Sequence, residues 1–218
     1  MSYEIPDTSS EKPKTRKPKL GTKIIGITGG IGSGKSTVSK FIEELGFPVY
    51  DSDFWAKELV NVDENLKSRI IELLGEESYD ENGKYNRKFV AEKVFENQEL
   101  LLQLNQIIHP AVKIHFENWV NAQNAEFVFK ETALLFKLKL NESCYQSILV
   151  TAEDNIKIKR VMDRDQKTYR EIEAIMQKQM PEKEKIKKAD FIIENNSDLE
   201  TLKSFTKQTI NELEKMDL

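Results

Sequence analysis

Short apolar runs separated by stretches of helical spacing dominate the hydrophobic pattern of this chain. Runs typical of buried parallel strands occur at residues 23–28, 47–50, 126–131, 147–151 and 190–194. Helical spacing occupies 35–45, 154–165 and 169–179, and Ser197 or Asp198 would cap a last helix that reaches about Lys215. Strands that alternate with helices favour parallel βαβ units. The sequence therefore predicts an α/β fold, a three-layer sandwich with a five-stranded parallel sheet between helices.

The region between the second and third predicted strands is almost wholly helical, broken by turns at Gly75 and at Asn82-Gly83. It is too long for one crossover helix, so we expect a helical insertion at 61–123. The predicted core then comprises 22–60, 124–152 and 181–218. Residues 1–21 combine prolines with basic and polar residues and have few apolar ones, which is typical of a disordered basic tail.

Composition limits the classes of function. The net charge of −4 over 218 residues argues against a general nucleic-acid binder, which needs a basic face. No apolar run approaches the roughly 20 residues of a membrane span, and no secretory signal precedes the first strand. The single cysteine, Cys144, excludes an internal disulfide. We expect a cytoplasmic protein with no membrane or nucleic-acid partner, and nothing indicates an obligate protein partner.

A glycine-rich segment between the first strand and the first helix matches the phosphate-binding P-loop, G-x-x-x-x-G-K-[ST]. It reads Gly29-Gly-Ile-Gly-Ser-Gly-Lys-Ser36. Glycines let successive N–H groups point inward, and the following helix offers unpaired donors to an anion. Lys35 would reach the β- and γ-phosphates, Ser36 would ligate Mg²⁺, and Thr37 would contact the α-phosphate. The predicted ATP-binding residues are Gly29, Gly30, Gly32, Ser33, Gly34, Lys35, Ser36 and Thr37.

The P-loop by itself does not separate GTPases, motor ATPases and small-molecule kinases. No Asn-Lys-x-Asp guanine-binding motif occurs in the chain. Residues 80–83 match the D-x-x-G of GTPase switches, but they lie in a polar turn between helices, where ordinary turn chemistry accounts for them. Motor ATPases are usually longer than this chain. Small-molecule kinases fit best.

Phosphoryl transfer also needs a carboxylate near the P-loop, at the carboxyl end of a strand. Asp51 and Asp53 follow the second predicted strand, and Glu131 ends the third. On an extended segment Asp51 and Asp53 would point in opposite directions, so only one of them would face the reaction. Ser52 could cap a helix that starts at Phe54. The alternative is that both aspartates are helix caps.

Taken together, these and further motifs resemble the dephospho-CoA kinase family, within the P-loop nucleoside monophosphate kinase group. The resemblance extends from about Ile24 to Leu213. The motifs that carry it are Ile25–Val38, Leu45-Gly46, Val49-Tyr-Asp-Ser-Asp53, Val94-Phe95, Ile108-His109-Pro110, Leu134-Leu135-Phe136, Lys159-Arg160 with Arg164-Asp165, and Ala189–Asn195. The P-loop is generic, whereas the ordered set is specific.

This resemblance implies ATP-dependent phosphorylation of the ribose 3′-hydroxyl of dephospho-CoA, the last step of coenzyme A biosynthesis. It implies that Asp53 binds the acceptor and takes its proton, and that Lys35, Arg160 and Arg164 neutralise the transferring phosphate. Residues 153–180 would be a helical lid over ATP, and the insertion would bind the CoA portion, with His109 in contact with it or shaping it. The alternatives are a solvated face for the arginines and a core position for His109. His115 has no motif around it and is expected to be structural.

The chain departs from the family pattern after the third strand, where Asp-x-Pro-Leu-Leu-Phe-Glu is usual. Here the segment begins with Glu131 and ends with Lys137. Glu131 keeps a carboxylate that could reach Mg²⁺ through water, whereas Lys137 reverses a charge. Two other functions stay open: a P-loop kinase with a different small acceptor, and an ATP-bound regulatory or scaffold protein. Adenine in this fold is often recognised through the backbone near the last strand, so Asn195 and Asn196 are no more than candidates for reading it.

Overall fold

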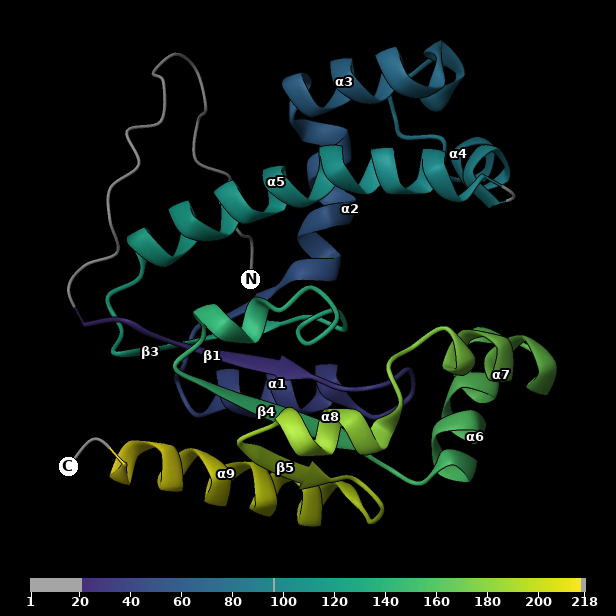
Figure 1. The fold of residues 1–218 in the computed structure, drawn as a ribbon. Helices are drawn as coiled ribbons and strands as arrows, with labels where there is room; N and C mark the ends of the chain where they lie inside the picture. The colour runs from purple at the N-terminus through teal and green to yellow at the C-terminus, as the bar shows by residue number, and fades with distance from the viewer. Residues whose placement is uncertain (1–20, 96, 217–218) are drawn as a thin grey trace.

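The computed structural model describes residues 21–95 and 97–216 of the chain, and the predicted tail lies, apart from Gly21, outside them. The described part is an α/β fold around one parallel sheet of five strands (Figure 1). The strands are β1 (Lys23–Thr28), β2 (Val49–Asp51), β3 (Phe127–Glu131), β4 (Gln146–Thr151) and β5 (Phe191–Glu194). Their order in the sheet is β2-β3-β1-β4-β5. This confirms the predicted fold class.

The helices that cover one face of the sheet come from the two ends of the described chain. They are α1 (Lys35–Glu44) and α9 (Leu199–Lys215). Ile25 and Ile27 of β1 point to this face and pack with Val38 of α1 and Leu202 of α9 in one buried cluster. Asp198 caps α9 by accepting a hydrogen bond from the Thr201 N–H, so it and not Ser197 is the cap.

The stretch between β2 and β3 forms a helical unit above the sheet in Figure 1. Its helices are α2 (Ser52–Val62), α3 (Glu64–Leu74), η1 (Glu76–Ser78), α4 (Arg87–Phe95) and α5 (Gln98–Ala122). A second buried cluster holds this unit together and reaches the sheet at Tyr50 and Val128. The turn at Asp80 is closed by its own carboxylate, which accepts the Asn82 and Lys84 N–H groups. Turn chemistry therefore explains the D-x-x-G match.

The remaining helices follow β3 and β4. They are η2 (Leu140–Ser143), α6 (Asp154–Asp165), α7 (Tyr169–Gln177) and α8 (Glu182–Lys188). The helices α6 and α7 project beyond the sheet in Figure 1, whereas α8 lies across it. The sequence pattern predicted α6 and α7 but not α8. Within the described residues, no helix combines the length and apolar character needed to cross a lipid bilayer.

Candidate active site

The P-loop connects β1 to α1 with the backbone shape that the motif requires. Gly32 and Gly34 have φ values of 75° and 94°, in the left-handed region that favours glycine. Gly34 precedes α1, so no side chain caps this helix. Its first N–H groups and the positive end of its dipole are thus left for an anion.

Three P-loop glycines are also needed because other segments approach the loop closely. A Cβ on Gly29 would overlap the carbonyl oxygen of Val150 in β4. One on Gly32 would overlap the carbonyl oxygen of Lys157 in α6, and one on Gly34 would overlap Asn195 Nδ2. The loop is therefore packed against β4, α6 and the segment after β5. The motif explains these glycines by the backbone conformations they allow. The structure adds a second reason, which is that neighbouring segments leave no room for a side chain.

Lys35 bends its ammonium group back over the loop. Its Nζ donates to the Gly29 carbonyl at 3.0 Å and to the Gly30 carbonyl at 3.4 Å. Burial lowers the pKa of Lys35, while the negative charges of Glu131 and Asp53 act in the opposite direction. The predicted cation therefore lies among the predicted carboxylates, held by weak neutral acceptors that a phosphate can replace.

Glu131 joins the end of β3 to the start of α1. It pairs in register with Ile27 of β1 and with Asp51 of β2. Its Oε1 accepts from Ser36 Oγ at 3.2 Å and its Oε2 from Ser39 Oγ at 2.6 Å. Burial raises the pKa of this carboxyl, and the two serine bonds oppose the shift. Glu131 thus orients the hydroxyl that the motif assigns to Mg²⁺.

The expectation that Ser52 caps the helix after β2 is wrong, and so is the extended conformation assumed for Asp53. The carboxylate of Asp51 accepts the N–H groups of Asp53 and Phe54, both at 2.9 Å, and caps α2. Because Asp51 satisfies these donors, α2 begins at Ser52 and Asp53 lies in its first turn. Burial and the nearby Asp51 raise the pKa of Asp53, whereas Lys35 lowers it.

The two arginines lie on α6 but differ in their contacts. Arg160 Nη2 donates to Asn195 Oδ1 at 3.1 Å, and Asn195 Nδ2 donates to the carbonyl of Ser33 at 2.8 Å. The Arg160 Nη1 is buried with no hydrogen-bond partner among the described residues. Arg164 forms two bonds with its neighbour Asp165, at 2.6 and 2.8 Å. Arg160 is therefore tied to the P-loop, and Arg164 is not.

Asn195 and Asn196 both use their side chains within the protein. Asn195 links Arg160 to the P-loop, as described above, and the Oδ1 of Asn196 accepts the Glu153 N–H at 2.8 Å at the start of α6. Their side chains thus support the phosphate site rather than standing free for a base.

The histidines of α5 have different surroundings. His115 Nδ1 lies 2.9 Å from the Tyr50 hydroxyl, and the His115 ring lies 4.1 Å from that of Trp55, centroid to centroid. These contacts hold the half-buried His115 against the aromatic side chains of the helical unit. His109 is half-buried, and burial lowers its pKa. Among the described residues the His109 side chain has no hydrogen-bond or ion-pair partner, so the structure does not tie it to the P-loop.

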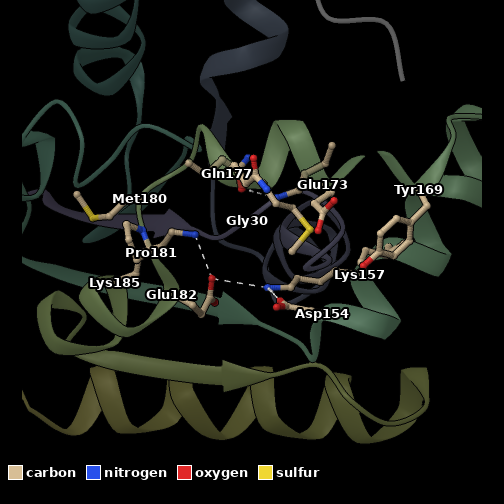
Figure 2. Close-up of a pocket in the computed structure, with 14 residues that line it drawn as sticks. Gly30, Asp154, Lys157, Tyr169, Glu173, Gln177, Met180, Pro181, Glu182 and Lys185 are labelled. Carbon is tan, nitrogen blue, oxygen red and sulfur yellow. Dashed lines mark hydrogen bonds and ion pairs between the residues drawn. The ribbon is translucent and has the colours of Figure 1, made fainter. Parts of the chain in front are cut away.

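The sequence motifs missed a set of side chains from α6, α8 and the segment before α8. Gln179 Oε1 accepts the N–H of Ile31 in the P-loop at 3.1 Å. Glu182 accepts from Thr151 Oγ1 at 2.5 Å and from Lys185 Nζ at 3.1 Å, and Lys157 Nζ lies 3.7 Å away. They line a cavity of about 400 Å³ beside Gly30 (Figure 2). No motif or periodicity in the sequence distinguishes these residues.

The fold and this site define a P-loop kinase: a phosphate loop with a part-buried lysine, carboxylates at the ends of β2 and β3, and arginines on α6 after β4. The family model described as dephospho-CoA kinase matches residues 23–201. The chain is 40% identical over 183 residues to a dephospho-CoA kinase from Fusobacterium nucleatum, covering 84% of this chain and 94% of the relative. It belongs to the dephospho-CoA kinase family.

Solved structures share the fold. A Thermus thermophilus protein is 34% identical, with a TM-score of 0.78, and the match covers 88% of this chain and 98% of the other. A dephospho-CoA kinase from Campylobacter jejuni, 24% identical, has a TM-score of 0.60 and coverages of 88% and 98%. The latter supports the fold alone. As a member of this family the chain is a kinase, a transferase that takes its phosphate from ATP.

Proposed function

We propose that this chain transfers the γ-phosphoryl group of ATP to the ribose 3′-hydroxyl of dephospho-CoA, giving CoA and ADP. The observation that carries the proposal is the family match over 23–201, which spans the P-loop, both carboxylate positions and the arginines of α6. The hydroxyl oxygen forms a bond to the γ-phosphorus, the bond from that phosphorus to the β–γ bridging oxygen breaks, and ADP leaves.

Asp53 is the residue we assign to acceptor binding and proton removal. The opposite charges of Asp53 and Lys35 each act on the pKa of the other. A raised pKa makes a carboxylate a better base near neutral pH. Because the transition state of phosphoryl transfer is loose, the proton is needed only late, and a carboxylate suffices.

The cations have separate roles in this proposal. Lys35 leaves the carbonyls of Gly29 and Gly30 and binds the β- and γ-phosphates. Arg160 offers its buried, unpartnered Nη1 to the phosphates, while Asn195 fixes its other nitrogen. Arg164 exchanges Asp165 for the transferring group when the lid region, 153–180, closes. Planar guanidinium groups suit phosphate oxygens well.

Mg²⁺ fits the oxygen donors that the site offers. Ser36 Oγ and Glu131 are hard oxygen ligands at the P-loop, and Mg²⁺ characteristically takes few protein ligands beside phosphates and water. When bound, Mg²⁺ would supply charge neutralisation at the β- and γ-phosphates. We assign Ser36 to direct contact, and Glu131 to contact through water.

Residues 61–123, which make up most of the helical unit, are the proposed binding region for the CoA portion, with His109 as a candidate contact. Closure of the lid would exclude water as a competing acceptor. The cytoplasmic location expected from the sequence remains a prediction.

The test is ADP release by the purified chain with dephospho-CoA as acceptor, with the product identified as CoA by mass. Dephospho-CoA should support turnover far above shikimate, AMP or uridine. Lys35→Met should abolish turnover, whereas Lys40→Met, on the exposed side of the same helix, should not. Equal turnover with another acceptor would support a different P-loop kinase, and ATP binding without turnover would support a regulatory protein.

A further inference from the structure

We propose that Lys185, held in place by Glu182, is a second phosphate-binding cation that meets the γ-phosphate of ATP alongside Lys35. The proposal deepens the proposed function and rests on it for the identity of the nucleotide. Lys185 is on α8, outside the P-loop and outside the α6 segment that carries the arginines.

The ammonium group of Lys185 lies beside Gly30 of the P-loop. A Cβ built on Gly30 would lie 3.5 Å from Lys185 Nζ, and Lys35 Nζ lies 3.4 Å from the Gly30 carbonyl oxygen. Both ammonium groups therefore border the same P-loop residue. Figure 2 shows the Lys185 side chain running toward Gly30 from α8. The P-loop lysine serves the β- and γ-phosphates, so a cation beside it is placed for the γ end of the nucleotide.

Charge and burial also point to an anion beside Lys185. The residue is only 6% exposed, and Lys157 is only 3% exposed. Lys157 Nζ forms an ion pair with Asp154 Oδ1 at 2.8 Å. Among the described residues, Glu182 is the one carboxylate that forms an ion pair with Lys185. Buried cations require compensation, and Glu182 is shared between both lysines.

The positive charge of Lys185 also acts on Lys35. Burial is the main cause that lowers the pKa of Lys35, and the like charge of Lys185 lowers it further. A phosphate bound between the two ammonium groups would offset this repulsion. Gln179 fixes the loop at this position, because it accepts the Ile31 N–H and lies 3.2 Å from the same built Cβ.

A purely structural ion pair within α8 is the alternative, in which Lys185 only compensates the charge of Glu182. The two explanations differ for the double variant Glu182→Gln/Lys185→Met. Replacing both partners of a buried pair is often nearly neutral for folding, whereas removing one leaves an uncompensated charge. A structural pair predicts that the double variant regains function, and a phosphate ligand predicts that it does not.

The experiment measures the affinity of a non-hydrolysable ATP analogue and of ADP by calorimetric titration, with Mg²⁺ and without acceptor. Lys185→Met should weaken binding of the ATP analogue by about tenfold or more, the range for a lost charged hydrogen bond, and leave ADP affinity within about threefold. The double variant should stay as weak as Lys185→Met. Lys188→Met, at the exposed end of α8, should behave as the unaltered chain.

Recovery of ATP-analogue affinity in the double variant would overturn the proposal, and so would an equal loss for ADP or no loss at all. Thermal unfolding of each variant checks that it is folded, and the double variant keeps the test decisive if the single one is not. Since binding is measured without acceptor, a wrong acceptor would appear only as absent turnover with dephospho-CoA and would leave this result standing.

Discussion

Replacing Asp53 by asparagine is the sharpest test of the catalytic assignment. The change keeps the size of the side chain and removes its charge and its capacity to take a proton. The fold has little reason to change, because α2 is capped by Asp51, whose carboxylate accepts the backbone N–H of residue 53 rather than its side chain. Asparagine retains that N–H.

The structure lets the effects on stability and on catalysis be compared. A carboxylate in the first turn of a helix stabilises it by about 0.3–1 kcal/mol. Burial and the charge of Asp51 disfavour the ionised form of Asp53, as its raised pKa shows, so the two effects partly cancel. Loss of a general base costs about 10²–10⁴ in rate, which is roughly 3–5 kcal/mol in the barrier. The catalytic effect should exceed the change in stability.

The assay is kcat for ADP release with dephospho-CoA, beside titration with a non-hydrolysable ATP analogue. Asp53→Asn should lower kcat by about 10²–10⁴ and leave nucleotide affinity nearly unchanged. Asp51→Asn is the matched control, since asparagine also caps helices well. It removes a charge that raises the pKa of Asp53, so the acidic limb of kcat should move to lower pH. Near-normal turnover of Asp53→Asn, or an equal loss in Asp51→Asn, would refute the assignment.

Three further variants and one control variant test the residues that support the phosphate site. Gly34→Ala should abolish tight nucleotide binding, whereas Gly46→Ala, with almost the same φ (93° against 94°) but open space around it, should cost only backbone strain; calorimetry and thermal unfolding separate them. Glu131 has a folded-state pKa raised by burial above its ordinary 4.5, so its contribution to stability is present below that value and is lost as pH rises through the folded pKa. In Glu131→Gln the stability measured by thermal scans should therefore depend less on pH above about 4.5. The same variant should have a lower kcat. Asn195→Ala breaks the bond to the P-loop and should weaken ATP binding and destabilise the fold by about 1–3 kcal/mol in denaturant titration.

The fold was predictable where the pattern is local. Each strand is a short β-branched run, and intervening helices make parallel pairing the natural arrangement. The order of the strands in the sheet was not predictable, because β1 pairs with β3 about a hundred residues away, and the whole helical unit lies between them in the sequence. The α8 helix escaped prediction because its seven residues include only one large apolar side chain, Ile186.

The candidate site divides in the same way. The P-loop is one contiguous segment, so its chemistry can be read from eight residues. The residue that caps the helix after β2 could not be predicted from the sequence, since Asp51, Ser52 and Asp53 are all good caps. It is fixed by where the strand ends, and that depends on the pairing of Asp51 with Glu131. Lys185 is one of 33 lysines and arginines, and only its burial against Gly30 distinguishes it.

These contacts also limit how the proposed lid can move. Near its start, the carbonyl of Lys157 fills the space where Gly32 lacks a Cβ, and Arg160 is tied to the P-loop through Asn195. At its end, Gln179 bonds to the loop as well. Both ends of 153–180 are therefore fixed to the phosphate site, so closure should be confined to the part between them. That part contains Gln166, whose φ of 54° ends α6 in a left-handed turn. A hinge there would swing α7 over the nucleotide while α6, with Arg160, stayed in place, and Arg164 near the end of α6 would reach the phosphates by a change of side-chain rotamer.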